Sequence, residues 1–405
     1  MAYTLRVLSV KSAADAEREL AALGLDPFSI RNMGPKMLHR TLLLEKIGSR
    51  EGNILKQELL TLGGDVAVGG HGAERAPAET SVILMGTEKQ LRRLCADLSQ
   101  RTYGMPLLAA DILRLLDSEA TPCRRWNIGG RTLDFSRRAG IMGILNVTPD
   151  SFSDGNRYAT IEKAVARALE MEGEGADIID IGGESTRPNA TPVNHEEELR
   201  RVIPVLERLA GRLTIPVSVD TFKAVVAKEA LAAGAEIVND ISGLTFDERM
   251  AEVVAAAHAG LVLMHTRGRP DEMQKETAYG SLIAEVTAAL NDSLALAEAA
   301  GIAATRIVVD PGIGFGKSAG GNLEILRKLS EFSSLGRPIM VGTSRKSFIG
   351  AVLGRDMAER AFGTAATVAL AIANGASIVR VHDVREMRDV ADMAMALTEP
   401  VTGPF

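Results

Sequence analysis

The sequence contains little of what several classes of protein need. Only two cysteines occur in 405 residues, Cys95 and Cys123, and they form neither a CxxC pair nor a zinc-binding spacing. Such cysteines exclude a disulfide-built scaffold and are typical of reduced packing residues. Apolar runs such as residues 364–373 are short and interrupted, well below the ~20 residues that span a bilayer. The first residues also lack the basic segment and apolar run of a signal peptide. We therefore expect a soluble, cytoplasmic protein without a membrane partner.

An excess of positive charge is absent as well. Lys and Arg number 46 against 52 Asp and Glu, which gives a formal net charge of -6. A nucleic-acid-binding surface needs a basic stripe, so we expect no DNA or RNA partner. Hydrophobic residues are plentiful at 46% of the chain. At this length they can fill the cores of one large barrel and one smaller domain.

Residues 1–120 have the pattern of a separate α+β domain. Alternating or apolar runs predict strands at residues 3–10, 41–47, 65–68 and 81–85, and helical spacing predicts helices at residues 13–23, 53–62 and 88–98. No cluster of chemically active side chains stands out in this part. We interpret it as an accessory domain of unknown role, joined through a linker near residues 117–122 to a second domain at residues 121–405.

The second domain has a regular repeat from Gly140 onward. Strand-like runs alternate with amphipathic helical stretches, and the strands are predicted at residues 141–146, 177–181, 215–220, 236–240, 261–265, 307–310, 339–343 and 378–382. Three helix-to-strand joints begin with Gly-Ala, at Gly175, Gly234 and Gly375, where glycine suits a left-handed helix end. Eight such repeats in ~250 residues predict a closed parallel (β/α)8 TIM barrel. An open doubly wound sheet is disfavoured because no GxGxxG follows the first strand. The expected fold class is α/β, a TIM barrel with a smaller N-terminal α+β domain.

Polar residues gather where these strands end. The run MGILNVTPDSFSDG, residues 142–155, is an apolar strand that ends at Asn146 and continues into a polar loop. The carboxyl ends of barrel strands are where barrel enzymes build their sites. The other polar strand ends are residues 183–188, Asp220, Asn239, His265, Asp310, residues 344–346, Arg380 and His382. Ionisable groups on most strand ends exceed what a purely structural rim carries.

Three chemical clusters follow from these positions. Carboxylates, an amide and an ammonium suit a flat, nitrogen-rich heterocycle, and they are supplied by Asp220, Asn239, Asp310 and Lys346. The first and eighth strands supply side chains that suit the binding of an anion, namely Asn146, Arg380 and His382. The amide oxygen of Asn146 also suits Mg²⁺ that bridges phosphates. Arg187, in the run STRP, suits a carboxylate substrate.

Simpler interpretations exist for several of these residues. Asp220 could cap the helix that follows it, and His265 is better explained as a hydrogen-bonded rim residue than as a ligand. The run DPGIGFGK, residues 310–317, lacks the GxxxxGK[ST] spacing of a phosphate loop. A Schiff base at Lys346 is conceivable. No nucleophile with an adjacent base and no HExxH motif stands out, which predicts a reaction driven by positioning and electrostatics.

The barrel half, from about residue 142 to 390, resembles dihydropteroate synthase. The matching runs, in order, are GILNVTPDSFSDG, DIGGESTRP, SVDTF, IVNDISG, LMH, DPGIGFGK, GTSRKSFIG and RVHDV. The resemblance implies a transferase of folate biosynthesis that condenses 6-hydroxymethyl-7,8-dihydropterin diphosphate with para-aminobenzoate, giving 7,8-dihydropteroate and pyrophosphate. It also implies Mg²⁺ as cofactor and a homodimer.

The resemblance further implies residue roles. The pterin would be bound by Asp220, Asn239, Asp310 and Lys346, and pyrophosphate with Mg²⁺ by Asn146, Arg380 and His382, with Asn146 as the metal ligand. The aminobenzoate site would comprise Thr186, Arg187, Pro188, Phe315, Lys346 and Ser347. The catalytic residues among these would be Asp220, Asp310, Lys346, Arg380 and His382. Residues 150–155 and 183–189 would be loops that close over the site. The sequence departs from the family pattern at Asn189, usually glycine, and in the run LMHTRG.

Two other functions use a similar barrel. A methyltetrahydrofolate–corrinoid methyltransferase shares the pterin-binding fold, but it does not need STRP, SRKS and RVHD together. A pterin-binding regulator without catalysis, with the N-terminal domain as its output module, is the alternative from a different class. The presence of Asn146, Arg187, Lys346 and His382 argues against it.

Overall fold

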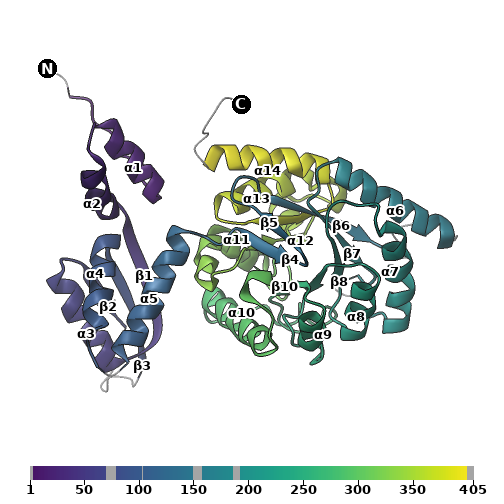
Figure 1. Cartoon of the computed structure of the whole chain (residues 1–405), viewed down its shortest axis with the longest axis horizontal. Helices are drawn as coiled ribbons and strands as arrows, with labels where there is room; N and C mark the ends of the chain where they lie inside the picture. Colours follow the sequence, from purple (N-terminus) through teal and green to yellow (C-terminus); the bar gives the residue numbers. More distant parts are fainter. Residues whose placement is uncertain (1–2, 70–78, 103, 149–156, 186–191, 399–405) are drawn as a thin grey trace. The chain divides into compact units, whose positions relative to one another are not determined.

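The computed structural model describes residues 3–69, 79–102, 104–148, 157–185 and 192–398. The chain divides into two compact units, Met1–Thr121 and Pro122–Phe405 (Figure 1). In the described residues, no helix combines the length and apolar character that crossing a membrane requires.

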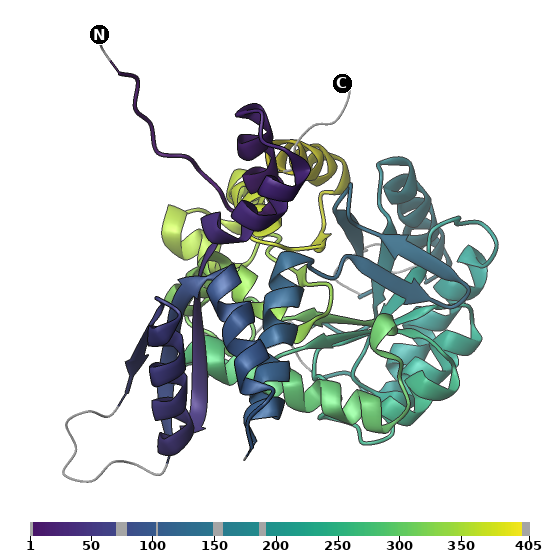
Figure 2. The same cartoon turned by 60° about the vertical axis from the view of Figure 1, so that its left-hand side comes forward.

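The first unit is an antiparallel sheet with helices packed on one face (Figure 2). Its sheet has the order β1-β3-β2. Leucines of the helices after the first strand pack against Leu42, Val82 and Leu84 to form the core. The elements are α1 (Ala13–Ala22), α2 (Pro27–Met37), β1 (His39–Gly48), α3 (Ser49–Thr61), β2 (Asp65–Val68), β3 (Glu79–Thr87), α4 (Glu88–Leu98) and α5 (Met105–Ala120).

The predicted strand at residues 3–10 is wrong. These residues have no regular secondary structure, and Tyr3, Leu5 and Val7 are 87%, 91% and 98% exposed. Alternation alone does not make a strand, because its N–H and C=O groups need a neighbouring strand, and the sheet of this unit forms without this segment. Sequence reasoning also missed α2, which Asp26 caps, and α5, which continues into the predicted linker as far as Ala120.

The second unit is a barrel of eight parallel strands, which confirms the predicted TIM barrel. The sheet order is β11-β10-β9-β8-β7-β6-β13-β12. A parallel bridge between Val309 and Ile339 joins the two end strands and closes the ring. The strands are β6 (Gly140–Asn146), β7 (Ile178–Gly182), β8 (Val217–Asp220), β9 (Ile237–Asp240), β10 (Gly260–Met264), β11 (Ile307–Asp310), β12 (Met340–Val341) and β13 (Ile378–Val381).

Helices surround this barrel and pack on the outer faces of its strands (Figure 1). The predicted joints are confirmed at Gly175, Gly234 and Gly375, whose φ angles are +99°, +108° and +102°. The helices are α6 (Arg157–Gly173), α7 (His195–Leu209), α8 (Ala224–Ala232), α9 (Met250–Ala256), α10 (Leu282–Ala299), α11 (Ala319–Arg327), α12 (Ser347–Leu353), α13 (Ala361–Ala373) and α14 (Val384–Thr398), and short 3-10 turns lie at Ala304–Arg306, Leu329–Leu335 and Met357–Glu359.

A hairpin that the sequence did not reveal covers the amino-terminal end of the barrel (Figure 1). It consists of β4 (Arg125–Ile128) and β5 (Arg131–Asp134). Trp126 is fully buried, and its Nε1 donates to the carbonyl of Arg306, the residue before β11, at 2.7 Å. Its apolar partners inside the barrel include Met142, Ile178, Ile237, Val262, Val308, Met340 and Ile378. This apolar floor closes one end of the barrel, so a site must open at the other.

Replacing Trp126 should test the importance of this floor. We expect Trp126→Ala to lower the free energy of unfolding by about 3–5 kcal/mol, because it opens a cavity in a closed apolar cluster. Trp126→Phe should lose about 1 kcal/mol through the hydrogen bond to Arg306. Urea unfolding followed by far-UV circular dichroism measures the stability of both variants. Tryptophan fluorescence would not serve, because both variants lack Trp126, the only tryptophan of the chain. Arg125→Ala, on the exposed side of the hairpin, is the control. Unchanged stability of Trp126→Ala would contradict the role of the floor.

Candidate active site

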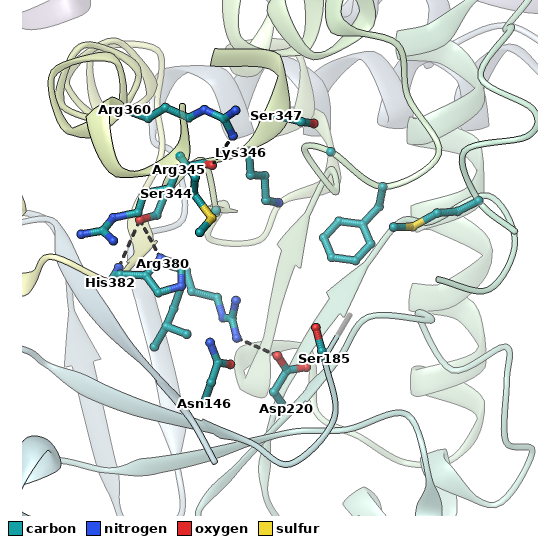
Figure 3. Close-up of a pocket in the computed structure, with 16 residues that line it drawn as sticks. Asn146, Ser185, Asp220, Ser344, Arg345, Lys346, Ser347, Arg360, Arg380 and His382 are labelled. Atoms are coloured by element: carbon teal, nitrogen blue, oxygen red, sulfur yellow. Dashed lines mark hydrogen bonds and ion pairs between the residues drawn. The ribbon is translucent and has the colours of Figure 1, made fainter. Parts of the chain in front are cut away.

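A cavity of about 390 Å³ opens at the carboxyl ends of the barrel strands (Figure 3). Strand ends and the loops after β11 and β12 contribute most of its wall. The lining residues are Ile144, Asn146, Ser185, Asp220, Met273, Gly314, Phe315, Gly342, Ser344, Arg345, Lys346, Ser347, Met357, Arg360, Arg380 and His382. This is the rim at which the sequence predicted the site.

The structure brings most of the predicted site residues together. Seven of them line the cavity: Asn146, Asp220, Phe315, Lys346, Ser347, Arg380 and His382. Asn239 and Asp310 are not in the lining and are 2% and 4% exposed, on strands β9 and β11. Thr186, Arg187, Pro188 and residues 150–155 lie outside the described residues. Arg345 and Ser344 also line the cavity, next to Lys346.

Arg380 lines the cavity and is held between two carboxylates. Its Nε donates to Asp180 Oδ2 and its Nη2 donates to Asp220 Oδ2, both at 2.6 Å (Figure 3 shows the second contact). Asp180 is fully buried, and the side chain of Arg380 is 19% exposed. Burial alone would lower the pKa of Arg380, but its ion pairs with Asp180 and Asp220 raise it. The guanidinium is therefore a fixed positive charge.

Asp180 contacts two predicted site residues, and the sequence analysis missed it. Its Oδ2 accepts from Asn239 Nδ2 at 2.9 Å in addition to Arg380. The sequence signal was present, because Asp180 is the only charged residue in the apolar strand IIDIG. A charged residue within a buried strand requires partners of opposite charge or hydrogen-bond donors.

Asp220 pairs with Arg380 and does not cap a helix, so the helix-cap interpretation is wrong. Helix α8 begins at Ala224, whose N–H donates to Asp247 Oδ2 at 2.9 Å. The pKa of Asp220 is raised to about 7, chiefly by burial; Arg380 opposes the rise and Asp180 adds to it. Asp220 is thus a carboxyl group that can exchange a proton near neutral pH.

Lys346, which follows β12, and Asp310, at the end of β11, influence each other electrostatically. The Nζ of Lys346 donates to the carbonyl of Ile313 and lies 4.6 Å from the centroid of the Phe315 ring. Burial lowers the pKa of Lys346 to about 8, although Asp310 opposes this shift. Burial raises the pKa of Asp310, and Lys346 opposes that shift in turn. An amine held as a donor over an aromatic ring is placed to bind a flat ligand.

Glycines bring the loop after β11 close to this lysine. A Cβ at Gly312 would lie 1.9 Å from the carbonyl oxygen of His265, and one at Gly314 would lie 2.9 Å from Lys346 Cδ. Both glycines have positive φ angles, +72° and +84°. These glycines therefore allow the loop to pack closely against its neighbours. This role agrees with the sequence analysis, in which the run DPGIGFGK lacks the spacing of a phosphate loop.

His265 is a hydrogen-bonded residue behind the loop. Its Nδ1 lies 2.9 Å from Lys317 Nζ, which also donates to the carbonyl of Phe315 at 2.9 Å. Burial and the neighbouring Lys317 lower the pKa of His265 to about 3, so the ring is neutral. The predicted rim role of His265 agrees with this contact. Lys317 fixes the backbone that carries Phe315.

Besides Arg380, the polar groups Asn146 and His382 line the β6 and β13 side of the cavity (Figure 3). His382 Nδ1 lies 2.9 Å from Ser344 Oγ, and this hydroxyl also accepts from the N–H of His382 at 3.2 Å. Arg345, next to Ser344, forms an ion pair with Asp383. These contacts hold the β12 and β13 ends together around the place expected for an anion.

The comparisons with known proteins identify the family. Residues 142–382 match the family described as pterin binding enzyme. The chain belongs to the dihydropteroate synthases. It is 49% identical over 271 residues to dihydropteroate synthase of Synechocystis, a match that covers 67% of this chain and 94% of that protein. The predicted family and its transferase class are confirmed.

Solved structures agree with this assignment. The Xanthomonas albilineans enzyme with 4-aminobenzoic acid is 44% identical and has a TM-score of 0.64, covering 69% of this chain and 99% of that one. Its complex with 7,8-dihydropteroate is 42% identical with a TM-score of 0.62, covering 69% of this chain and all of that one. Both matches span about the length of the barrel unit.

A longer relative matches almost the whole chain. The probable bifunctional folylpolyglutamate synthase/dihydropteroate synthase of Halobacterium salinarum is 43% identical over 386 residues, which cover 95% of this chain. The chain spans only 46% of that relative. The barrel unit begins at Pro122, so this match extends over most of the first unit as well.

Asp220 should make the stability of this dihydropteroate synthase depend on pH. Its pKa rises from 3.8 to about 7 on folding, so its stabilising contribution is complete below the lower value and is lost as pH rises through the higher one. We expect the melting temperature of Asp220→Asn, relative to wild type, to rise by at least about 2 °C between pH 5 and pH 7. Differential scanning calorimetry measures this difference.

Asp134→Asn is the matched control for the Asp220 experiment. Hydrogen bonds from Ser136 and Arg125 lower the pKa of this exposed carboxyl to about 2, so it does not titrate between pH 5 and pH 7. Its melting temperature relative to wild type should stay constant over this interval. A constant or falling difference for Asp220→Asn would contradict the raised pKa.

Proposed function

We propose that this dihydropteroate synthase joins 6-hydroxymethyl-7,8-dihydropterin diphosphate to para-aminobenzoate and releases pyrophosphate, as a step of folate biosynthesis. The observation that carries the proposal is a cavity lined by the buried carboxyl group of Asp220, by the amide of Asn146 and by a lysine placed over an aromatic ring. The ligands of the Xanthomonas albilineans structures support this reaction, since 4-aminobenzoic acid is one proposed substrate and 7,8-dihydropteroate is the proposed product.

The buried polar groups are suited to the pterin. The ring carries N–H donors and an oxo group on one edge, and Asp220, Asn239 and Asp310 offer carboxylate and amide oxygens from adjacent or facing strands. Lys346 can donate to a ring nitrogen or oxygen. Departure of pyrophosphate leaves positive charge on the exocyclic carbon and the ring, which the carboxylates of Asp220 and Asp310 stabilise.

The second substrate requires little acid–base chemistry. An arylamine is neutral at pH 7 and attacks without a strong general base, which agrees with the absence of a nucleophile–base pair in the motifs. We assign the aminobenzoate ring to Phe315 and Lys346, with Ser347 beside them. Thr186, Arg187 and Pro188 remain predicted parts of this subsite. The chemistry is then positioning of two rings in one cavity.

We assign the diphosphate to the side of the cavity with Asn146 and His382. Arg380 also faces the cavity, but its described contacts bind it to Asp180 and Asp220, so its charge serves the carboxylates as much as any phosphate. The predicted catalytic roles of Asp220, Asp310, Lys346, Arg380 and His382 remain proposals. In this arrangement Arg380 lies between the carboxylates assigned to pterin binding and the side of the cavity assigned to the diphosphate.

Mg²⁺ fits this site as an ion carried by the diphosphate. Among the described residues, no group of three or more His, Cys, Asp or Glu side chains could hold a metal ion. Mg²⁺ commonly keeps several waters and binds through one or two protein oxygens plus substrate phosphates. Asn146 Oδ1 is the described candidate ligand. When bound, the ion would neutralise charge on the leaving pyrophosphate.

The remaining predictions concern the protein as a whole. We propose a cytoplasmic homodimer, and an accessory role in assembly or regulation for the first unit. The Halobacterium relative supports an accessory role, because its match extends over most of this unit. The Synechocystis enzyme matches only 67% of the chain, which supports a barrel that works without the first unit.

Turnover with purified protein tests the proposed reaction. We expect release of one pyrophosphate per dihydropteroate when the pterin diphosphate, para-aminobenzoate and Mg²⁺ are all present, measured with a coupled pyrophosphate assay and chromatography of the product. Lys346→Met should lower kcat/KM by ~100-fold through loss of a buried donor. Lys328→Met, on the surface, should match wild type. Pterin binding without product formation would favour the regulator instead.

Deletion of the first unit tests the separation of the two parts. We expect a protein of residues 122–405 to keep kcat/KM within about threefold of the full chain, because every residue that lines the cavity belongs to the second unit. Its assembly state by analytical ultracentrifugation, or its melting temperature, should change. Loss of turnover in a truncated protein with native circular dichroism would contradict the separation.

A further inference from the structure

Asp180 occupies an interior position that barrel packing alone does not explain. Its neighbours Ile179 and Ile181 point outward into the core between strands and helices, and Ile178 belongs to the apolar floor. Asp180 therefore faces the barrel interior, in register with Ser218 of β8. Burying a carboxylate is costly, and apolar residues of similar size replace buried ion pairs without loss of stability in many proteins. A requirement other than packing must keep this carboxylate.

The contacts of Asp180 connect strands that are not neighbours. One oxygen, Oδ2, accepts from Arg380 Nε of β13 at 2.6 Å and from Asn239 Nδ2 of β9 at 2.9 Å. In the sheet, β6 lies between β7 and β13, and β8 lies between β7 and β9. Asp180 thus fixes two side chains from opposite directions, and both belong to the predicted substrate-binding set.

The contact with Asn239 decides which way its amide faces. A side-chain amide has a donor end, the NH2 group, and an acceptor end, the oxygen. A carboxylate oxygen only accepts hydrogen bonds, so it must face the donor end. Nδ2 of Asn239 is therefore turned toward Asp180, which leaves Oδ1 as the end that can meet a ligand. Asn239 is in register with Asp220, which lines the cavity. The edge of the site near β8 and β9 consequently presents oxygen acceptors.

We propose that Asp180 is a positioning residue that turns the Asn239 amide and the Arg380 guanidinium for pterin binding, and so makes the site select a ring edge that presents N–H donors. The inference rests on the proposed function and names a specificity determinant of the same site. Asp180 acts through Asn239 and Arg380 and need not touch the substrate.

The first experiment compares two ligands in the full-length protein. Calorimetric titration measures the affinity for the pterin diphosphate and for its analogue in which the ring amino group is replaced by an oxo group. We expect Asp180→Asn to weaken binding of the pterin diphosphate on the order of 10- to 100-fold. The ratio of the affinity for the amino ring to that for the oxo ring should fall at least ~5-fold in this variant. The reason is that the Asn239 amide can then present either its oxygen or its NH2 group to the ligand. The KM for para-aminobenzoate should change less than about twofold.

Ser218→Ala is the matched control. Ser218 is as buried as Asp180 and adjacent to it in register, and its hydroxyl has no hydrogen-bond partner among the described residues. A merely structural effect at this level of the barrel should appear in both variants. Equal losses in Ser218→Ala and Asp180→Asn, or an unchanged ligand preference in Asp180→Asn, would overturn the proposal.

A reciprocal exchange keeps the test decisive if Asp180→Asn does not fold. Asn239→Asp alone places two carboxylates together and should abolish detectable pterin binding. The double variant with Asp180→Asn and Asn239→Asp restores a donor–acceptor pair with the same atoms and charge, and it should recover at least ~10-fold of the lost affinity. No recovery in a folded double variant would refute the positioning role. Because the affinities for the two ring analogues decide the test and need no turnover, an absence of turnover in wild type would count against the proposed function alone.

Discussion

The ion pairs of Arg380 with Asp180 and Asp220 are the interaction on which the active end of the barrel depends. A guanidinium inside a barrel is tolerated only with negative partners, and each carboxylate in turn is tolerated because of the guanidinium. The three groups come from β13, β7 and β8, which lie within a run of four neighbouring strands, so their geometry depends on the packing of these strands. Removing Arg380 leaves two buried carboxyl groups without their cation, at a cost of about 3–5 kcal/mol, whereas removing either carboxylate leaves Arg380 with one partner.

This polar arrangement requires an apolar layer beneath it. Trp126 and its barrel partners exclude polar groups from the amino-terminal end. Two residues further along the strands, Ile178 is followed by Asp180 and Ile237 by Asn239, because side chains on one face of a strand recur at every second residue. The same strand thus supplies an apolar floor and a polar site. A low dielectric around the floor strengthens the ion pairs above it.

The sequence predicts the frame of the molecule better than its interior. Apolar runs, glycine joints and polar strand ends identified the barrel and placed Asp220, Lys346 and His382 at its rim. Asp180 was not predicted because it lies inside a strand. There the sequence alone does not show which face of the sheet a residue occupies or which side chains it contacts. The hairpin with Trp126 escaped because its strands are four residues each and gain their stability from the barrel. The false strand at residues 3–10 shows the opposite error, an apolar pattern without a partner.

The distribution of buried charge separates the two units chemically. In the described part of Met1–Thr121, Glu88 is the buried charged side chain, and it pairs with Arg92 on the same helix. The barrel unit buries Asp180, Glu184, Glu198, Asp220, Asp240, Asp310, Lys317 and Arg388. Burying ionisable groups is costly, and they concentrate where chemistry needs them. Among its described residues the first unit has an apolar core, which supports the proposed accessory role and the proposal that the chemistry lies in the barrel.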